Sequence, residues 1–391
     1  MLKISTLALG AFAVGTSGYV VTGVLPQLSE ELSVSLSTAG LLTTSFAVAY
    51  AIGSPLLAVA LGGWRRRPLI IAALLVAAAG NALAALAPNF AVLTAARIVT
   101  AVGAAVFTPA ATAVAAELSG PERRARAAAW VFGGLVTATI VGVPAGTLLV
   151  GPLGHRGVFW LVAGFCALSA VAVAVAVPEV AAPARVTLRQ RVAVASDSRV
   201  VTVLGITLAA SLGVFTVYTY AAPVLAETVG AHGTGLSLLL FGYGLGGAVG
   251  NVVGGFAADR YGYRMPLLVA VSGSVVALSA LSALSALSAL SAVHSTAIAA
   301  VLLFVWGVSS WGFNPPVQRR LLELSPDAGG LLLALNASAL YLGIGLSGVV
   351  GGAVLDHAGI AAVALTGALL CCVAVLIQVL SGRRAALQPT R

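Results

Sequence analysis

The sequence predicts an all-α membrane protein with twelve transmembrane helices, in two pseudo-symmetric six-helix halves with both termini in the cytoplasm. Three observations lead to this prediction: the composition, the spacing of the apolar runs and the placement of the basic residues. Of the 391 residues, 60% are hydrophobic and 8% are charged, whereas a soluble domain has about 25% charged residues. This composition argues against a soluble enzyme and against a disordered chain.

A helix that crosses the hydrocarbon core of a bilayer needs about 20 mostly apolar residues, and the chain divides into twelve such runs. In chain order they are Ile4–Leu25, Thr38–Leu61, Pro68–Ala87, Ala91–Ala116, Ala127–Val150, Val158–Val177, Val200–Ala222, Gly235–Ala257, Pro266–Leu290, Ala297–Pro315, Leu331–Leu355 and Gly359–Leu380. We expect the first run to be a structural helix and not a signal peptide, because it continues to Leu25.

The basic residues predict the orientation, because cytoplasmic loops of membrane proteins carry an excess of Lys and Arg. If the N-terminus is cytoplasmic, 18 of the 20 Lys and Arg fall on the cytoplasmic side. Arg156 falls in an outer loop and Arg97 inside the fourth run. The net charge of +9 therefore marks a membrane surface and does not indicate a nucleic-acid partner. We expect a monomer in a lipid bilayer, the bacterial-type inner (plasma) membrane.

The two halves repeat one another. Pro26 and Glu30 recur 197 residues later as Pro223 and Glu227, and a second matched stretch recurs with an offset of 206. A tract of five Leu-Ser-Ala triplets, Leu278–Ala292, lies between the matched stretches. The two offsets differ by 9 residues, which is the length of three triplets. We infer that the triplet expanded there, lengthening the ninth helix or the loop after it.

The predicted organisation is an N-terminal six-helix half at 1–177, a cytoplasmic linker at 178–199 and a C-terminal half with a cytoplasmic tail at 200–391. Two homologous six-helix halves are typical of secondary transporters, which bind a small-molecule substrate near the bilayer midplane.

The eighth run ends in a loop with a recognisable motif, Gly255-Phe-Ala-Ala-Asp259-Arg260-Tyr-Gly262-Tyr-Arg264. It resembles the G-x-x-x-D-R-x-G-x-R loop of the major facilitator superfamily. We expect Gly255 to allow a close approach of helices, and Asp259 to cap a helix or to pair with an arginine, so that the loop latches one conformation. The alternative is a simple cytoplasmic anchor.

Arg97 is the only charged residue inside a predicted helix. An arginine at a helix centre costs about 2.5–3.5 kcal/mol even on cellular insertion scales, so we expect it to face the interior of the bundle. A side chain that snorkels to the membrane surface is the alternative. Arg97 resembles the fourth-helix arginine of the superfamily's drug-efflux branch. The fifth-run sequence Gly142-Val-Pro144-Ala-Gly146 resembles a Gly/Pro motif of its antiporters and predicts a bent, closely packed helix.

The first run contains Gly15-Thr16-Ser17-Gly18-Tyr19, which is similar to the Gly-Thr-Ser-Glu-Phe stretch of chloramphenicol-resistance and sugar- or drug-efflux permeases. This resemblance implies the major facilitator fold and the twelve-helix drug:proton antiporter branch. Those relatives often carry a carboxylate at the position of Gly18. Here all 11 Asp and Glu and all four His fall in predicted loops or at helix ends. The usual proton carriers, Asp, Glu and His side chains, are therefore absent from the middle of the predicted spans. Whether transport uses a proton gradient stays open.

Polar and aromatic residues at the middle of the runs are candidates for binding substrate, because rings offer contact area to apolar compounds and amides orient them. For each one alone, helix packing is the alternative. Besides Arg97, the candidates are Thr16, Tyr19, Tyr50, Tyr218, Tyr220, Tyr243, Trp306, Asn314, Asn336 and Tyr341.

The predicted function is secondary-active export of a small amphipathic compound, such as a drug or antibiotic, by alternating access. Two alternatives stay open: facilitated transport of sugar- or nucleoside-like solutes without proton coupling, and a membrane sensor that binds its ligand without moving it. An enzyme is not expected, because the sequence has no nucleophile–base pair, metal cluster or phosphate loop. We expect no cofactor and no metal.

Overall fold

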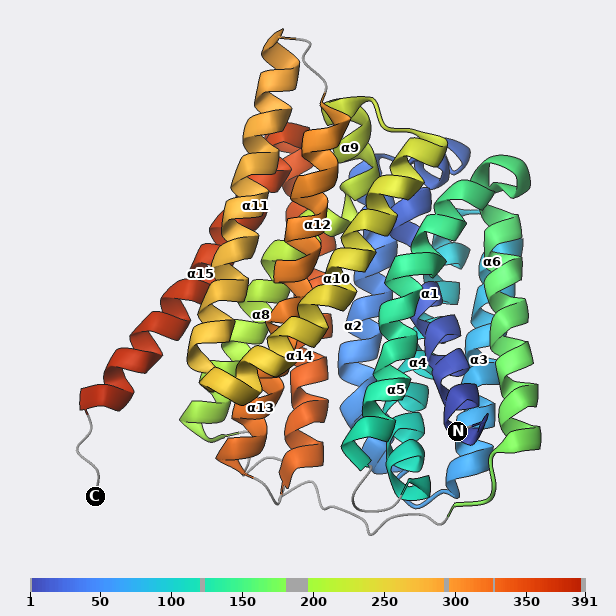
Figure 1. The fold of residues 1–391 in the computed structure, drawn as a ribbon. Helices are drawn as coiled ribbons and strands as arrows, with labels where there is room; N and C mark the ends of the chain where they lie inside the picture. Colours follow the sequence, from blue (N-terminus) through green and yellow to red (C-terminus); the bar gives the residue numbers. More distant parts are fainter. Residues whose placement is uncertain (1, 120–123, 181–195, 292–294, 326–327, 388–391) are drawn as a thin grey trace. The chain divides into compact units, whose positions relative to one another are not determined.

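The computed structural model describes residues 2–119, 124–180, 196–291, 295–325 and 328–387, which form helices joined by short turns and contain no strand (Figure 1). The first part of the chain forms α1 (Leu2–Glu31), α2 (Leu36–Ala60), α3 (Arg66–Leu86), α4 (Phe90–Leu118), α5 (Arg124–Thr137), the π-helix η2 (Ala138–Gly142) and α6 (Val143–Ala176). The second part forms α8 (Ser198–Thr219), α9 (Ala221–Val229), α10 (Gly233–Tyr261), α11 (Arg264–Ser291), α12 (Thr296–Gly312), α13 (Asn314–Leu324), α14 (Gly329–Ala358) and α15 (Ile360–Leu387).

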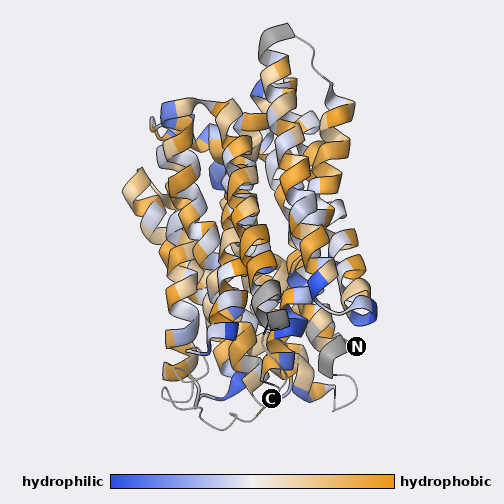
Figure 2. Ribbon diagram, turned by 90° about the vertical axis from the view of Figure 1, so that its left-hand side faces the viewer, coloured by the Kyte–Doolittle hydropathy of each residue, from blue (hydrophilic) through white to orange (hydrophobic). Residues whose placement is uncertain are grey.

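Eleven helical stretches of the described chain are long and apolar enough to cross a membrane. Figure 2 shows that the helices are hydrophobic along most of their length and that hydrophilic residues gather mainly toward their ends. Ten stretches each coincide with one predicted run, whereas the stretch Ala129–Ala176 covers both the fifth and the sixth. It has 48 residues, about 72 Å if it were one straight helix, against a hydrocarbon core of about 30 Å.

This long stretch is interrupted at Gly154. Its φ of 65° and ψ of 173° are not helical, and a positive φ is a conformation that glycine adopts without a steric penalty. Figure 1 shows the stretch as two helical arms joined by a turn. The interruption lies between the two runs that the sequence predicts as separate helices.

The chain divides into two compact units. One consists of Met1–Thr187 with Gly233–Phe241, and the other of Leu188–His232 with Gly242–Arg391. Most of the predicted linker, 178–199, falls outside the described residues. The predicted boundaries of the two halves therefore stay predictions.

In the N-terminal unit, α3 and α4 approach each other through glycines. A Cβ atom built on Gly103 of α4 would lie 2.7 Å from the backbone nitrogen of Ala77 in α3. One built on Gly80 of α3 would lie 2.6 Å from the backbone nitrogen of Thr100 in α4. Membrane helices associate through such close contacts, because lipid provides no hydrophobic driving force between them.

The Leu-Ser-Ala tract lies in α11 as far as Ser291, so the described part of the tract lengthens the helix. Leu278 and Leu281 are buried, and Leu287 is exposed. Ser282 donates a hydrogen bond to the carbonyl of Ala361 in α15 (3.2 Å). Leucines spaced by three residues drift around a 3.6-residue helix, so they do not share one face.

The glycine contact between α3 and α4 gives a stability prediction. Gly103→Ala should lower the melting temperature of the detergent-solubilised protein, because the added Cβ meets the α3 backbone and overpacking costs about 1–3 kcal/mol. Gly164→Ala is the matched control, since a Cβ on this helical glycine of α6 meets no atom within 4 Å. Equal melting temperatures for the two variants would contradict the packing described here.

Candidate functional site

Arg97 is fully buried in the N-terminal unit, with no exposed surface. It lies in the second turn of α4, a helix that begins where the side chain of Asn89 accepts a hydrogen bond from the backbone of Val92 (3.0 Å). Its guanidinium points into the unit and does not reach the surface. A buried charge must be compensated by hydrogen-bond acceptors.

Backbone carbonyls of two other helices provide that compensation. The Nη1 atom of Arg97 donates to the carbonyl of Ser17 (2.5 Å) and Nη2 donates to that of Gly18 (3.1 Å), both in α1. Nε donates to the carbonyl of Leu42 in α2 (3.5 Å). A carbonyl oxygen has two lone pairs, so these oxygens accept the guanidinium in addition to their helical hydrogen bonds. Arg97 thereby joins α4 to α1 and α2.

An aromatic ring covers the guanidinium. The Cζ atom of Arg97 lies 4.5 Å from the ring centroid of Phe46 in α2, within the range of a cation–π interaction. The ring of Phe46 in turn stacks on Tyr50, with centroids 6.5 Å apart. Gly18 lies beside the same ring, and a Cβ on Gly18 would make an ordinary contact with Phe46 at 3.4 Å.

A buried polar pair lies behind the carbonyls that hold Arg97. The hydroxyl of Ser17 donates to the amide oxygen of Asn81 in α3 (2.9 Å), and Nδ2 of Asn81 donates to the carbonyl of Ala77 (2.8 Å). Both side chains are fully buried. The sequence-based reasoning missed Ser17 and Asn81. An amide in an otherwise apolar run was the available signal, since a buried amide needs hydrogen-bond partners.

Thr16 and Tyr19, two substrate-binding candidates three residues apart in α1, lie in different surroundings. Tyr19 and Tyr50 are buried in the N-terminal unit, and Thr108 forms a hydrogen bond with Tyr50. Thr16, in contrast, lies against Gly142: a Cβ on Gly142 would be 2.9 Å from the Thr16 methyl carbon. Thr16 therefore faces η2, whereas the carbonyl of the next residue binds Arg97.

In the C-terminal unit, three of the predicted residues form an aromatic cluster. Tyr218 stacks on Tyr243 with ring centroids 4.7 Å apart, and Trp306 lies 4.6 Å from Tyr243 and 6.3 Å from Tyr218. Phe215 packs edge-on against Tyr218. Tyr220 has a different contact, because its hydroxyl donates to the carbonyl of Gly348 in α14 (2.7 Å).

A chain of polar side chains joins α8, α13 and α14 in the same unit. The hydroxyl of Thr207 donates to the amide oxygen of Asn336 (2.7 Å), and Nδ2 of Asn336 donates to Oδ1 of Asn314 (3.4 Å). The structure thus brings Asn314 and Asn336 together. Tyr341 is partly buried on α14, one turn beyond Asn336.

The loop at the end of α10 contacts α13 of its own unit. The Nη1 atom of Arg319 donates to the carbonyl of Ala258 and lies 3.8 Å from Oδ1 of Asp259, and its Nε lies 2.7 Å from Glu323. The Asp259 side chain is 85% exposed, and exposed pairs contribute about 0–1 kcal/mol. In this conformation the ion pair between Arg319 and Asp259 contributes little to stability. The hydrogen bond from Arg319 to the Ala258 carbonyl is the closer contact.

The glycines of this loop differ from the prediction. A Cβ on Gly255 would meet no atom within 4 Å, so the expected close helix approach at Gly255 is wrong. The approach occurs one residue earlier, where a Cβ on Gly254 would meet the backbone of Gly312 in α12. Gly262 ends α10 with a φ of 74°, a backbone conformation that favours glycine. Arg264 bonds to the hydroxyl of Tyr263 (3.2 Å) and the guanidinium of Arg260 lies 5.7 Å from the Tyr261 ring.

The fifth-helix Gly/Pro motif coincides with an irregular turn. Residues Ala138–Gly142 form a π-helix, and Pro144 lies in the first turn of α6. Gly142 packs against Thr16, and Gly146 packs against Val20. Proline lacks the N–H that would continue the helical ladder, which accounts for the widened turn that precedes it.

A titratable pair lies away from Arg97, at the end of α1. The Nδ1 atom of His155 is 2.8 Å from Oε2 of Glu31, and His155 is 2% exposed. His155 directly follows the interruption at Gly154, so the pair is at a helix end, as the sequence predicts for these residues. The described residues contain no cluster of three or more His, Cys, Asp and Glu side chains that could hold a metal ion.

Comparison with known proteins places this geometry in a family. The model of the Major Facilitator Superfamily matches residues 7–201 and 203–390. The inner membrane transport protein YdhP of Escherichia coli (strain K12) is 32% identical over 379 residues, covering 97% of this chain and 95% of that protein. A chloramphenicol resistance protein of Streptomyces lividans is 31% identical over 360 residues, covering 91% and 90%.

The fold is similar to that of a solved transporter. The crystal structure of a bacterial homolog to the human lysosomal transporter Spinster, inward-facing and occupied, has a TM-score of 0.75, with 18% identity and coverage of 97% of this chain and 96% of that one. This likeness supports the fold alone. The family match and the multi-span helical structure make the protein a multi-pass transporter of a bacterial inner membrane and not an enzyme. The chain belongs to the major facilitator superfamily.

Proposed function

We propose that the chain exports a small amphipathic compound, drug- or antibiotic-like, by alternating access. We also propose that it has twelve spans, with the two arms of Ala129–Ala176 crossing separately and both termini in the cytoplasm. The length of that stretch and its interruption at Gly154 support the twelve spans. The chloramphenicol resistance protein among the relatives supports export of such compounds.

The single observation that carries the functional proposal is the buried guanidinium of Arg97. It is a permanent positive charge held in a fixed orientation by three carbonyl oxygens and one aromatic ring. We infer that it anchors a polar or anionic group of the substrate, with Phe46 and Tyr50 as neighbouring apolar contacts. The aromatic cluster of Tyr218, Tyr243 and Trp306 is a separate candidate, in the other unit, for contact with an apolar compound.

We expect Arg97→Ala to reduce transport of its best substrate about tenfold or more, because hydrogen bonds to charged groups contribute about 1.5–3 kcal/mol. Arg97→Lys should be only partly active, since an ammonium lacks the planar fork that reaches the carbonyls of Ser17 and Gly18 together. The measurement is a drug-susceptibility panel in an efflux-deficient host, followed by uptake of the best compound into proteoliposomes.

Arg156→Ala is the matched control, because Arg156 is exposed and lies away from the buried site. It should retain wild-type transport. Each variant must be present in the same amount as the wild-type protein, and its melting temperature must show that it is folded. Wild-type rates for Arg97→Ala with every transported compound would overturn the role proposed for this residue.

We further propose that coupling to protons is weak or absent, or that it proceeds through Asp259. The partners that hold Arg97 are carbonyl oxygens, which do not titrate. Facilitated transport of sugar- or nucleoside-like solutes without proton coupling is therefore a second candidate function. Uptake into inverted vesicles is measured with and without a pH gradient. If uptake by the wild-type protein depends strongly on the gradient and Asp259→Asn keeps this dependence, the proposal is contradicted.

Gly18→Glu should make transport more dependent on a pH gradient than it is in the wild type. A Cβ at this position makes an ordinary contact with Phe46, and the backbone of residue 18 already binds Arg97, so the new carboxylate would lie beside the guanidinium and could exchange a proton. Gly18→Gln, with the same size and no charge, is the control. Identical gradient dependence of the two variants would show that position 18 cannot carry the proton.

A further inference from the structure

Basic residues gather where α10 ends and α11 begins, next to α13 of the same unit. Four arginines and two acidic residues lie there: Arg260, Arg264, Arg319, Arg320, Asp259 and Glu323. Arg319 contacts both carboxylates, because its Nε lies 2.7 Å from Oε1 of Glu323 and its Nη1 lies 3.8 Å from Oδ1 of Asp259. This group of residues, which we call the arginine cluster, therefore has two more positive than negative charges.

Two arginines of the cluster share one aromatic ring. The Cζ atom of Arg320 lies 4.7 Å from the ring centroid of Tyr263, and the Cζ atom of Arg264 lies 5.9 Å from the same centroid. Both distances are within the range of a cation–π interaction. The ring thus holds two like charges near each other, although like charges repel. An anion bound beside the ring would offset this repulsion.

These residues also have hydrogen-bond donors in excess. The hydroxyl of Tyr263 accepts a hydrogen bond from Nε of Arg264 (3.2 Å), and the described residues offer no acceptor for its own hydrogen. Within the described part of the chain, no carboxylate lies within 4.0 Å of Arg260 or Arg264. Arg320 reaches Glu323 only at 4.0 Å. A ligand with several negatively charged oxygens, such as a phosphate group, would complete these donors.

Exposed apolar surface leads to the arginine cluster along two helices. On α10, Phe256 and Val253 are exposed and lie four and seven residues before Arg260, so they share its face of the helix. On α11, Met265 and Val269 are exposed and lie one turn apart. Both helices belong to stretches that are long and apolar enough to cross a membrane. The arginines therefore lie at the ends of lipid-facing surfaces, at the level of the lipid headgroups.

We propose that the arginine cluster binds the phosphate group of an anionic phospholipid, with Arg264 and Arg320 as charge partners and Tyr263 as a hydrogen-bond donor. The excess of positive charge favours a lipid with a net negative charge over a zwitterionic lipid, which would bring a cation of its own to the arginines. The lipid-facing surfaces of α10 and α11 favour a lipid over free phosphate. This site is additional to the substrate site proposed at Arg97 and does not depend on it.

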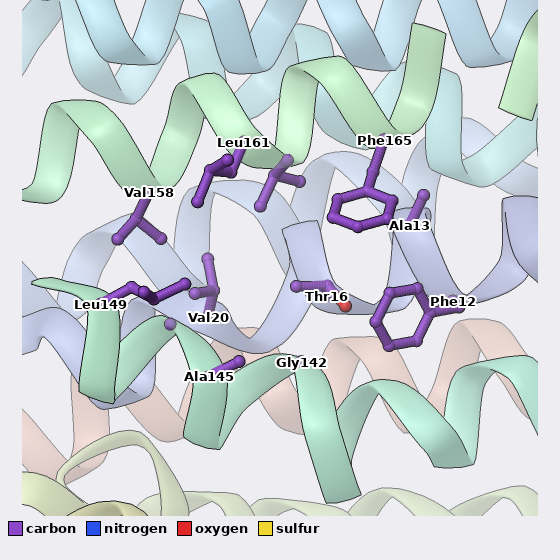
Figure 3. Close-up of a pocket in the computed structure, with 12 residues that line it drawn as sticks. Phe12, Ala13, Thr16, Val20, Gly142, Ala145, Leu149, Val158, Leu161 and Phe165 are labelled. Carbon is purple, nitrogen blue, oxygen red and sulfur yellow. The ribbon is translucent and has the colours of Figure 1, made fainter. Parts of the chain in front are cut away.

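The apolar pocket of the N-terminal unit lacks these features. It lies between α1 and the two arms of α6, and aliphatic and aromatic side chains surround it (Figure 3). None of its twelve lining residues is charged, and the side chain of Thr16 packs against Gly142. An acyl chain can contact such walls, but nothing there compensates the charge of a phosphate group. We therefore expect the headgroup at the arginine cluster and not at this pocket.

Two lipids with the same chains test the proposal on the full chain in detergent. Dioleoylphosphatidylglycerol has a net negative charge, whereas dioleoylphosphatidylcholine is zwitterionic. Native mass spectrometry resolves each bound lipid and gives an apparent Kd. The wild-type protein should bind the phosphatidylglycerol at least about fivefold more tightly, the factor expected for one basic residue near an anionic lipid. Glycerol 3-phosphate, which has the phosphate but no chains, should not displace it at equal concentration.

Substitutions then test the individual residues. Arg264→Gln and Arg320→Gln should each raise the Kd of the phosphatidylglycerol about fivefold and leave that of the phosphatidylcholine nearly unchanged. Arg264→Lys keeps the charge and should keep most of the affinity. Tyr263→Phe keeps the ring and should raise the Kd about 2- to 5-fold, as expected for one lost hydrogen bond. Arg156→Gln is the matched control, because it removes an exposed arginine of the N-terminal unit.

A phosphatidylglycerol with a photoreactive diazirine in its headgroup tests the location. It should label peptides that contain Arg260–Val269 and not those that contain Val158–Phe165, which line the apolar pocket in part. Labelling confined to the pocket peptides would overturn the proposal.

Three binding results would also overturn it. They are equal affinities of the wild-type protein for the two lipids, an equal loss of phosphatidylglycerol in Arg156→Gln and Arg264→Gln, and displacement of the lipid by an equal concentration of glycerol 3-phosphate. The last result would indicate a site for a free phosphate compound. Because the assay measures binding without transport, its failure would leave the transport experiment on Arg97 unaffected.

Discussion

The burial of one positive charge, on Arg97, is the constraint on which the N-terminal unit depends. A guanidinium inside a membrane-spanning helix is tolerated only where the protein surrounds it with acceptors. α1 and α2 supply these acceptors from their backbones, which requires both helices to lie close to α4. The carbonyl of Gly18, which accepts from the guanidinium, and the ring of Phe46, which covers it, both lie at this junction of the three helices.

The choice of backbone acceptors has a chemical consequence. A carboxylate partner would change its charge with pH and would exchange a proton with the substrate pathway. Carbonyl oxygens keep the same partial charge at every physiological pH, so the environment of Arg97 is constant. The arrangement thus favours a fixed electrostatic anchor over a site that is charged and discharged in each transport cycle.

The sequence predicts the helices of this fold well, because the length of an apolar run follows directly from the thickness of the bilayer. It predicts the interruptions less well. The turn at Gly154 falls in the gap between the predicted fifth and sixth runs, whereas the break between α12 and α13 at Phe313 falls inside the predicted tenth run, although two prolines follow it closely. Arg97 was predictable as the only charge inside a run. Its partners were not, since main-chain oxygens leave no trace in the sequence, and Gly254 and Gly255 differ only in the helical face on which they lie.

The length of α11 has a consequence for how this chain can vary. Each Leu-Ser-Ala triplet adds about 4.5 Å and turns the helix by about 300°, so only six triplets, about 18 residues, complete whole turns. An addition of three triplets leaves everything beyond it rotated by about half a turn. Because the tract forms the C-terminal end of α11, the residues from Arg264 to Ala277 keep their angular phase whatever the number of triplets. The repeat therefore lies where a change in length alters the fit to membrane thickness without rotating the part of the helix that precedes it.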